Sequence, residues 1–238
     1  MINNKILVLT DNLYKNYYLG KSTVQVLNGI DLDIFEGEIV AVMGPSGVGK
    51  STLLHILGVL DRPTSGRVEI DNTDIFSFDD KKLAEFRNKT VGFVFQFHHL
   101  LPEFSALENV MIPGMMAGES HNRVKTRAIE LLNEVNLADR LDHRPSELSG
   151  GEQQRVAVAR SLINSPKLVL ADEPSGNLDR HSAESLHQLF WDLNKKINQT
   201  LVIVTHNHEL AEQADRVIEL FDGRIKTNKV KNNIQNTE

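Results

Sequence analysis

The sequence contains no cysteine, no long hydrophobic run and no excess of positive charge. Without cysteine the chain cannot form disulfides, thiolate metal sites or a cysteine nucleophile. The longest apolar runs, residues 39–43 and 168–171, are far shorter than the roughly 18 residues that a membrane-spanning helix needs. The 26 Lys and Arg residues and the 32 Asp and Glu residues give a net charge of −6. This balance disfavours a broad surface for nucleic acid or anionic lipid, and we expect no nucleic-acid partner.

The length and the hydrophobic content bound the architecture. With 238 residues, 40% of them hydrophobic, the chain can bury the core of one large domain or of a domain with a subdomain. Residues 1–5 contain no apolar stretch of signal-peptide length. We therefore expect a soluble, cytosolic protein, and any membrane-spanning part of its machinery would come from another chain.

The first hundred residues alternate between strand-like and helix-like segments. Residues 39–43 form a continuous apolar run, as in a strand that is buried on both faces. The run leads into a glycine-rich loop, and residues 51–60 after the loop have the pattern of a helix. The other segments expected here are strands at 6–9, 24–27, 31–34, 68–70 and 91–95, and a charged helix at 79–88.

The pattern changes after residue 100. Residues 101–145 lack strand patterns, and apolar residues at helical spacing in 124–135 predict a helical subdomain that continues into 152–163. Strands and helices then alternate again, with strands at 168–171, 201–205 and 217–221 and helices at 181–197 and 208–214. Such alternation predicts an α/β fold in which helices cover a largely parallel sheet. The asparagine-rich residues 227–238 are expected to form a frayed tail.

The glycine-rich loop carries the first functional motif. Residues 44–51 match the pattern G-x-x-x-x-G-K-[ST] between a predicted strand and a predicted helix. Glycines let successive backbone N–H groups face an anion at the helix N-terminus. A chance match has a probability on the order of one in a hundred, so the loop predicts nucleoside triphosphate binding. The residues expected to contact the nucleotide here are Gly44, Pro45, Ser46, Gly47, Val48, Gly49, Lys50, Ser51 and Thr52.

Within this phosphate loop two side chains have distinct expected tasks. Lys50 would reach the β- and γ-phosphates, and the Ser51 hydroxyl would bind Mg²⁺. The donors are local and preorganised, so an acidic protein can hold a polyanion at this point.

Two carboxylates end the apolar run at 168–171. The carboxyl ends of parallel strands open on the ligand crevice, so Asp172 and Glu173 are expected to face the phosphate loop. Asp172 suits a Mg²⁺ ligand, directly or through water, and Glu173 suits a general base for hydrolysis. The alternative is a strand that ends in a solvated acidic turn, and the phosphate loop makes that alternative much weaker.

A second anion-binding surface is predicted at residues 148–154, which read Leu-Ser-Gly-Gly-Glu-Gln-Gln. Ser149 is well placed as the N-cap of the helix that follows. The helix N-terminus and the neighbouring glycine amides attract anions. A lone peptide of this kind would be interpreted as an ordinary capped helix start.

The motifs together resemble those of the ATP-binding cassette (ABC) ATPases. The phosphate loop, residues 148–154, the pair Asp172–Glu173 and residues 175–179 (Ser-Gly-Asn-Leu-Asp) occur in the order and spacing of that family, and the resemblance covers about residues 6–225. It implies a P-loop NTPase ABC cassette with a mostly parallel core sheet, an N-terminal antiparallel β part and a helical signature subdomain. The implied division is a single ABC ATPase domain at 1–226, with a core at about 1–96 and 166–226, a helical subdomain at about 97–165, and the tail at 227–238.

The resemblance also implies roles for residues that the motifs alone do not single out. Tyr17 matches the aromatic residue that stacks on adenine, and Tyr18 is the alternative for this role. The competing explanation is that Tyr17 is an ordinary core tyrosine without a role in binding. Gln96 matches the glutamine that contacts Mg²⁺ and the attacking water and couples to a membrane subunit. His206 matches the histidine that contacts the γ-phosphate, and Asp179 matches an aspartate at the dimer interface. Catalysis would then rest on Glu173, His206 and Gln96, and Mg²⁺ on Ser51, Gln96 and Asp172.

In this family two copies pack head to tail. Each ATP lies between the phosphate loop of one copy and the signature peptide of the other, here Ser149, Gly150 and Gly151. ATP would favour the closed dimer because its γ-phosphate completes the interface, and hydrolysis would allow the dimer to open.

Other interpretations are less favoured. The pairs His98–His99 and His206–His208 lack a completing Cys or carboxylate set, so we do not favour a zinc site. ABC ATPases that act on ribosomes generally carry two cassettes, and those that act on DNA carry a long coiled coil. A compact single cassette of 238 residues with an acidic balance fits neither class. A nucleotide-dependent binding module without turnover would not need Glu173, Gln96 and His206, which are all present.

The region after Gln96 narrows the resemblance to one type of transporter. The chain looks very like the ATPase of the bacterial lipoprotein-releasing (Lol) system in four segments, residues 60–66, 95–110, 143–152 and 172–179. Ser175 is a mild departure, because relatives commonly have Thr at this position. The implied partners are two integral membrane subunits docking near residues 96–104, through apolar contacts that comprise Phe97, Leu100, Leu101 and Phe104.

The implied task is release of outer-membrane-directed lipoproteins from the inner membrane to a periplasmic chaperone. This chain would work at the cytoplasmic face of the bacterial inner membrane as a peripheral protein. A macrolide-exporter-like or cell-division-type ABC complex of the same architecture is the alternative.

Overall fold

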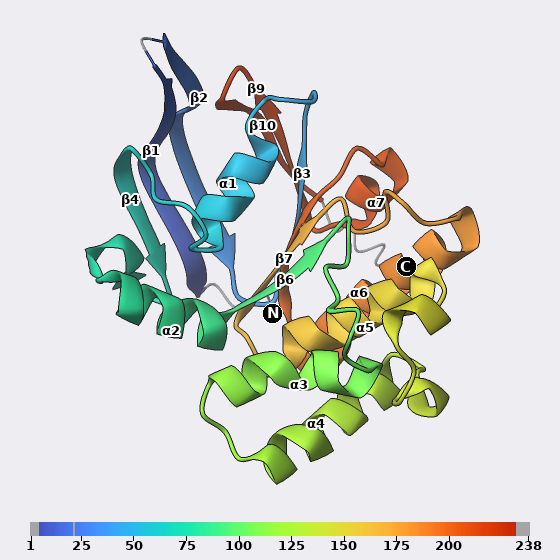
Figure 1. Cartoon of the computed structure of the whole chain (residues 1–238). Coiled ribbons are helices and arrows are strands. Elements are labelled where there is room, and N and C mark those ends of the chain that lie inside the picture. Colours follow the sequence, from blue (N-terminus) through green and yellow to red (C-terminus); the bar gives the residue numbers. More distant parts are fainter. Residues whose placement is uncertain (1–4, 21, 232–238) are drawn as a thin grey trace.

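The computed structural model describes residues 5–20 and 22–231, and their strands form two sheets (Figure 1). The antiparallel sheet has the order β2 (Ser22–Phe35), β1 (Ile6–Leu19), β4 (Ser65–Ile70) and β5 (Thr73–Asp74). The second sheet has the order β10 (Arg224–Val230), β9 (Arg216–Phe221), β3 (Ile39–Met43), β8 (Thr200–Val204), β7 (Leu168–Asp172) and β6 (Val91–Phe95). All neighbouring pairs in the second sheet are parallel except β10 with β9.

The central strands of the parallel sheet are buried on both faces. Within β3, Val40 and Val42 join one apolar core, whereas Ala41 between them joins the other. The same alternation holds in β8, where Val202 and Ile203 face opposite cores. This burial explains why these strands are continuous apolar runs and do not alternate with polar residues.

The two cores are covered by different layers. The α1 helix (Lys50–Leu57), the antiparallel sheet and α2 (Asp80–Thr90) cover one face of the parallel strands. The helices on the other face are α3 (Ala106–Met116), α4 (His121–Glu134), α5 (Gly150–Leu162), α6 (Arg180–Ile197) and α7 (His208–Gln213). In Figure 1, α1 and the helices α3 to α6 lie on opposite sides of the parallel strands. None of the helices in the described part of the chain is long and apolar enough to cross a bilayer.

The observed architecture confirms the expected fold class. The mostly parallel sheet, the N-terminal antiparallel part and the helical region of α3, α4 and α5 are all present. The N-terminal part differs in detail, because two strands of 14 residues replace the three short strands that we expected. Polar residues in β1 mimic a turn in the sequence. They lie instead at an irregularity between Thr10 and Leu13, where Asn12 has φ 49° and the strand continues beyond it.

The expectation of a frayed tail from residue 227 is wrong for its first part. Residues 227–230 form the second half of β10 and pair with β9, as in the partners Asn228 and Ile218. Edge strands are held by backbone hydrogen bonds, so a polar stretch with little apolar content can still be a strand. Residues 232–238 of the expected tail lie outside the described residues.

Candidate nucleotide-binding site

The phosphate loop connects the carboxyl end of β3 to the start of α1. Gly44, Gly47 and Gly49 have φ of 144°, 78° and 106°, which L side chains rarely adopt. A Cβ on Gly44 would also lie 2.4 Å from the carbonyl oxygen of Leu220. The Lys50 Nζ donates hydrogen bonds of 2.9 Å to the carbonyl oxygens of Gly44 and Pro45. The loop therefore curves around the ammonium group at the N-terminus of α1, as a phosphate-binding loop requires.

Asp172 lies beside this loop at the end of β7. Burial raises the pKa of the Asp172 carboxyl, and a hydrogen bond with the Ser51 side chain only partly opposes the shift. Lys50 and His55 are also close enough to act on its charge. The structure thus brings two of the three predicted Mg²⁺ ligands, Ser51 and Asp172, into contact, as two oxygen donors of the kind that Mg²⁺ prefers.

Glu173 is held by the neighbouring strand β8. Its backbone N–H donates to the carbonyl of Val204 over 2.9 Å, and its φ of 47° is left-handed. The Nδ1 of His206 lies 2.8 Å from Glu173 Oε2, and the His206 N–H donates to the same oxygen over 3.4 Å. His206 also lines a pocket of about 410 Å³ together with Gly44 and Pro45. The expected base and the expected γ-phosphate contact therefore meet next to the phosphate loop.

Gln96 follows β6, whose last residue Phe95 pairs with Asp172. The Gln96 Nε2 donates to Asn177 Oδ1 over 3.0 Å, and Asn177 Nδ2 donates back to the Gln96 carbonyl over 3.4 Å. Asn177 appeared in the sequence only as part of the peptide 175–179, and no role was expected for it. The contact connects Gln96 to the turn that follows Glu173.

A further link to this region comes from α5 and was missed by the sequence analysis. Gln154 is 1% exposed, and its Nε2 donates to the carbonyl of Phe95 over 2.7 Å. Arg160, later in α5, donates to the carbonyls of His98 and His99 over 2.6 and 2.7 Å. The sequence signal for Gln154 was its position four residues before Val158, which places both on the buried side of an amphipathic helix. These bonds fasten the signature helix to the segment that contains Gln96.

The signature peptide begins α5 with a complete capping box. The Ser149 hydroxyl accepts from the Glu152 N–H, and Glu152 Oε2 accepts from the Ser149 N–H over 2.8 Å. A Cβ on Gly151 would lie 2.9 Å from Ser182 Oγ, so this glycine packs closely against the start of α6. Since α5 and α1 belong to opposite sides of the parallel sheet, the two predicted anion-binding surfaces of one chain lie apart.

Asp179 is the N-cap of α6, where its carboxylate accepts from the Ser182 N–H over 3.0 Å. Hydrogen bonds from the Ser182 side chain and backbone lower the pKa of Asp179, which is solvent-exposed. The same helix start thus carries Asp179 and supports Gly151.

Tyr17 lies at the other end of the site, on β1. Tyr17 is 38% exposed and Tyr18 is 69% exposed, so neither is a core tyrosine. The Tyr17 hydroxyl donates to Asp61 Oδ2 over 2.9 Å and has a second hydrogen bond with the Thr52 side chain. Thr52 belongs to the first turn of α1, which places Tyr17, and not Tyr18, against the helix that follows the phosphate loop.

The segment predicted to meet a membrane subunit is exposed at three of its four apolar positions. Phe97, Leu101 and Phe104 are exposed, whereas Leu100 is partly buried against the core. A pocket of about 340 Å³ lies nearby, between residues of β6, α2, α3 and α5.

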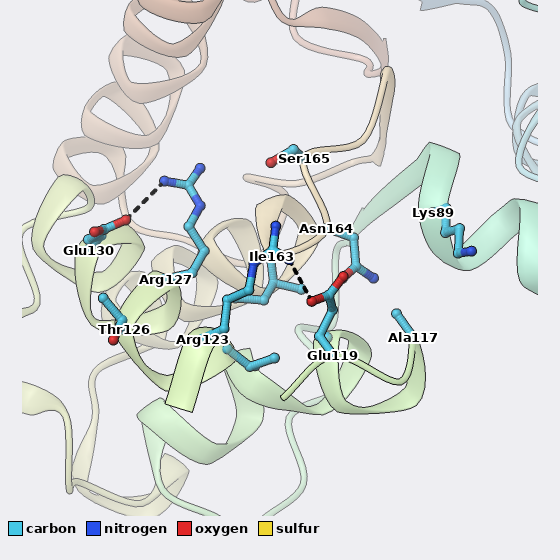
Figure 2. Close-up of a pocket in the computed structure, with 12 residues that line it drawn as sticks. Lys89, Ala117, Glu119, Arg123, Thr126, Arg127, Glu130, Ile163, Asn164 and Ser165 are labelled. Atoms are coloured by element: carbon cyan, nitrogen blue, oxygen red, sulfur yellow. Dashed lines mark hydrogen bonds and ion pairs between the residues drawn. The ribbon is translucent and has the colours of Figure 1, made fainter. Parts of the chain in front are cut away.

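A larger pocket of about 710 Å³ lies between the ends of α2, α3, α4 and α5 (Figure 2). Four of its charged side chains form two pairs, with Arg123 3.0 Å from Glu119 and Arg127 3.4 Å from Glu130. The residues predicted to bind nucleotide are not among those that line it, so it is separate from the site at the phosphate loop.

Comparison with known proteins identifies the family of this chain. The profile of the ABC transporter family matches residues 27–176. The lipoprotein-releasing system ATP-binding protein LolD of Bacteroides thetaiotaomicron is 58% identical over 204 residues, which cover 86% of this chain and 94% of that protein. The protein of the same name from Legionella pneumophila is 51% identical over 222 residues, which cover 93% and 98%.

Solved structures show the same fold. The dimeric structure of the ATP-binding cassette MJ0796, bound to ADP and Pi after hydrolysis, matches with a TM-score of 0.87 and 41% identity over 94% of this chain and 98% of that one. The structure of cbiO1 from Clostridium perfringens, part of the ABC transporter complex cbiONQ, matches with a TM-score of 0.85 and 27% identity over 95% and 89%. The chain therefore belongs to the ABC transporter family as an ATP-binding, ATP-hydrolysing cassette, and within that family it belongs with the lipoprotein-releasing ATP-binding proteins.

Proposed function

We propose that this chain is the ATPase subunit that powers release of outer-membrane-directed lipoproteins from the inner membrane to a periplasmic chaperone. The support is its 51–58% identity with relatives named for lipoprotein release, over nearly their full length. The chain would act as a peripheral protein at the cytoplasmic face of the inner membrane and would not touch the lipoprotein itself.

One observation carries the ATPase mechanism. The carboxylates at the end of β7 and His206 after β8 lie beside the phosphate loop that follows β3. Lys50 and the loop amides would hold the β- and γ-phosphates. Ser51, Asp172 and Gln96 would hold Mg²⁺, and the buried contact between Asp172 and Ser51 fits a hard cation with oxygen ligands. When bound, Mg²⁺ neutralises charge that develops on the transferred phosphoryl group.

Glu173 would accept the proton of the attacking water. Its Oε2 is already oriented by two contacts with His206, which leaves the carboxylate little rotational freedom. A base held in this way loses less entropy when water binds, and positioned general bases contribute rate factors of about 10² to 10⁴. His206 would then contact the γ-phosphate from the side of the adjoining pocket.

A second copy would complete each site. The signature residues Ser149, Gly150 and Gly151 begin α5, on the other side of the sheet from α1, which supports the proposal that they bind the ATP of a partner. The two matching structures of the cassette MJ0796 are dimeric. ATP would favour closure because its γ-phosphate binds both copies at once.

Two integral membrane subunits would dock near residues 96–104, where Phe97, Leu101 and Phe104 expose apolar surface. Movement of this segment would reach the signature helix through the bonds that Arg160 makes to His98 and His99 and through the bond of Gln154 to the adjoining Phe95. On this view residues 97–165 act as the helical subdomain of a single domain at 1–226.

Replacement of the base tests the mechanism. Glu173→Gln with ATP and Mg²⁺ should lower phosphate release by about 10²- to 10⁴-fold and trap a dimer, measured by light scattering after size exclusion. Glu212→Gln, an exposed position on α7, is the matched control and should retain activity. A Glu173→Gln protein that stays monomeric at high concentration, both alone and with its membrane subunits, would refute ATP-driven closure.

The transported substrate needs a separate experiment. The complex with its membrane subunits, reconstituted in proteoliposomes, should release a lipoprotein to a soluble acceptor in an ATP-dependent manner. Efflux of a macrolide without lipoprotein release would contradict the proposal.

A further inference from the structure

The segment of residues 60–66 resembles the family but received no role in the site. It runs from the end of α1 to β4 and lies along β1, the strand that carries Tyr17. The Thr64 N–H donates to the carbonyl of Tyr14 over 2.8 Å, and the Asn16 N–H donates to Thr64 Oγ1 over 2.9 Å. The segment is therefore fixed against the strand at several points.

Asp61 is the residue of this segment that reaches Tyr17. Its Oδ1 accepts from Lys15 Nζ over 2.6 Å and from the Arg62 N–H over 2.8 Å, and its Oδ2 accepts from the Tyr17 hydroxyl over 2.9 Å. Burial alone would raise the pKa of Asp61, but the hydrogen bonds from Lys15 and Tyr17 outweigh it and lower the pKa. The carboxylate is thus charged at neutral pH and engaged by three donors.

The same groups surround the Tyr17 ring. Lys15 Nζ lies 4.8 Å from the ring centroid, a cation–π distance, and its side chain is only 11% exposed. The carbonyl of Arg62 also accepts from Lys15 Nζ over 2.7 Å, so the ammonium group is fixed in turn. Asp61, Lys15 and Thr52 therefore restrict rotation of the ring of Tyr17, a residue that is still 38% exposed.

We propose that Asp61 is a positioning residue for nucleotide binding, which holds the Tyr17 ring in the orientation that contacts the base. The inference rests on the proposed base contact of Tyr17 and extends it to the segment of residues 60–66. A ring oriented in advance loses less rotational freedom when a base stacks on it, which favours binding. Asp61 acts only through Tyr17, so the phosphate contacts should not depend on it.

The test compares two ligands that differ in the base. Mg²⁺–ADP carries adenosine and two phosphates, Mg²⁺–pyrophosphate carries the phosphates alone, and neither supports hydrolysis of a γ-phosphate. Isothermal titration calorimetry on the full chain should show that Asp61→Ala and Tyr17→Phe each weaken ADP binding by about 3- to 10-fold. Pyrophosphate binding should change in neither variant, which also shows that each variant is folded.

The double variant separates positioning from a general effect. If Asp61 acts through the Tyr17 hydroxyl, Tyr17→Phe with Asp61→Ala should bind ADP no more weakly than either single variant. Asp80→Ala is the matched control, because Asp80 pairs with Arg62 of the same segment over 2.8 Å. This control should bind both ligands like the parent chain.

Several outcomes would overturn the inference. Unchanged ADP binding in Asp61→Ala, equal losses for ADP and pyrophosphate, or additive effects in the double variant would each do so. If Tyr17→Ala loses the preference for ADP while Asp61→Ala and Tyr17→Phe keep it, the base contact stands and only the positioning role fails. If Tyr17→Ala also keeps the preference, the proposed base contact fails together with the inference.

Discussion

At the scale of single residues, the carboxylate of Asp172 is expected to bind Mg²⁺ and at the same time to lower the stability of the folded chain. Its carboxyl is partly buried, and burial raises its pKa. The folded chain then holds the proton more tightly than the unfolded chain does. This favours folding at pH values below the ordinary carboxyl pKa and is lost as the pH rises through the folded-state pKa. At pH 7 the charged carboxylate therefore lowers the free energy of unfolding.

Asp172→Asn should separate the two effects. The amide keeps the shape and removes the buried charge, so the melting temperature of the ligand-free chain should rise at pH 7. The gain should shrink as the pH falls towards the carboxyl range. Loss of the expected Mg²⁺ ligand should lower phosphate release by roughly 10- to 100-fold.

The control for this change is Asp142→Asn, at an exposed position in the loop before α5. It should alter neither the melting temperature nor the activity. A fall in melting temperature of Asp172→Asn at pH 7, measured by differential scanning calorimetry, would show that the buried charge is not a net cost.

At the scale of elements, two helices of the described chain begin with the same device. Ser105 and Glu108 form a capping box at α3, and Ser149 and Glu152 form one at α5. Each box satisfies backbone N–H groups that a helix start leaves unpaired. Glu152 is further held by Arg140, whose Nε lies 3.1 Å from its Oε1. The α3 box therefore serves as an internal reference for the α5 box.

Ser105→Ala and Ser149→Ala should each destabilise the chain by about 1 kcal/mol, because each removes the hydroxyl that accepts the N-cap hydrogen bond. Ser149→Ala also removes the hydrogen bond of 2.9 Å from this hydroxyl to Glu152 Oε2. Urea denaturation measures this loss. Only Ser149→Ala should also lower phosphate release, by roughly tenfold or more, if its hydroxyl binds the partner's ATP. Equal losses of activity in both variants would mean that Ser149 acts through helix stability alone.

At the scale of the whole molecule, the parallel sheet separates the phosphate loop from the signature peptide, which are the two proposed halves of an ATP site. The phosphate loop begins α1 on one side, and the signature peptide begins α5 on the other. A Cβ on Gly150 would have only Leu178 Cδ2 within 4 Å, at 3.7 Å, so a side chain there would extend outward without a clash in its own chain. Gly150→Asp should therefore fold normally and repel the phosphates bound by a partner.

A mixing experiment tests whether each site uses two chains. Lys50→Ala and Gly150→Asp should each be inactive alone, because every site in either homodimer carries the defect. In an equal mixture half of the dimers are mixed, and each mixed dimer has one intact site. Phosphate release should then recover to about one quarter of the parent value if the sites act independently. No recovery at any mixing ratio would contradict the head-to-tail arrangement.

The sequence by itself determined the parts of this protein that depend on neighbouring residues. The phosphate loop, the carboxylates that end β7 and the capped start of α5 are local motifs, because their chemistry lies within a few consecutive residues. The parallel sheet was also predictable, since a strand buried on both faces must be a continuous apolar run. The resemblance to ABC ATPases supplied the expected roles of Tyr17, Gln96 and His206.

Only the tertiary structure decided the contacts between distant segments. The Tyr17–Asp61, Gln96–Asn177 and Gln154–Phe95 bonds join residues that are 44, 81 and 59 positions apart. Strand β10 likewise depends on backbone pairing with β9, and its polar side chains do not predict this pairing. The physical reason is common to all four cases. A hydrogen bond between distant segments requires their packing, and no local pattern of residue types specifies which polar group will face which.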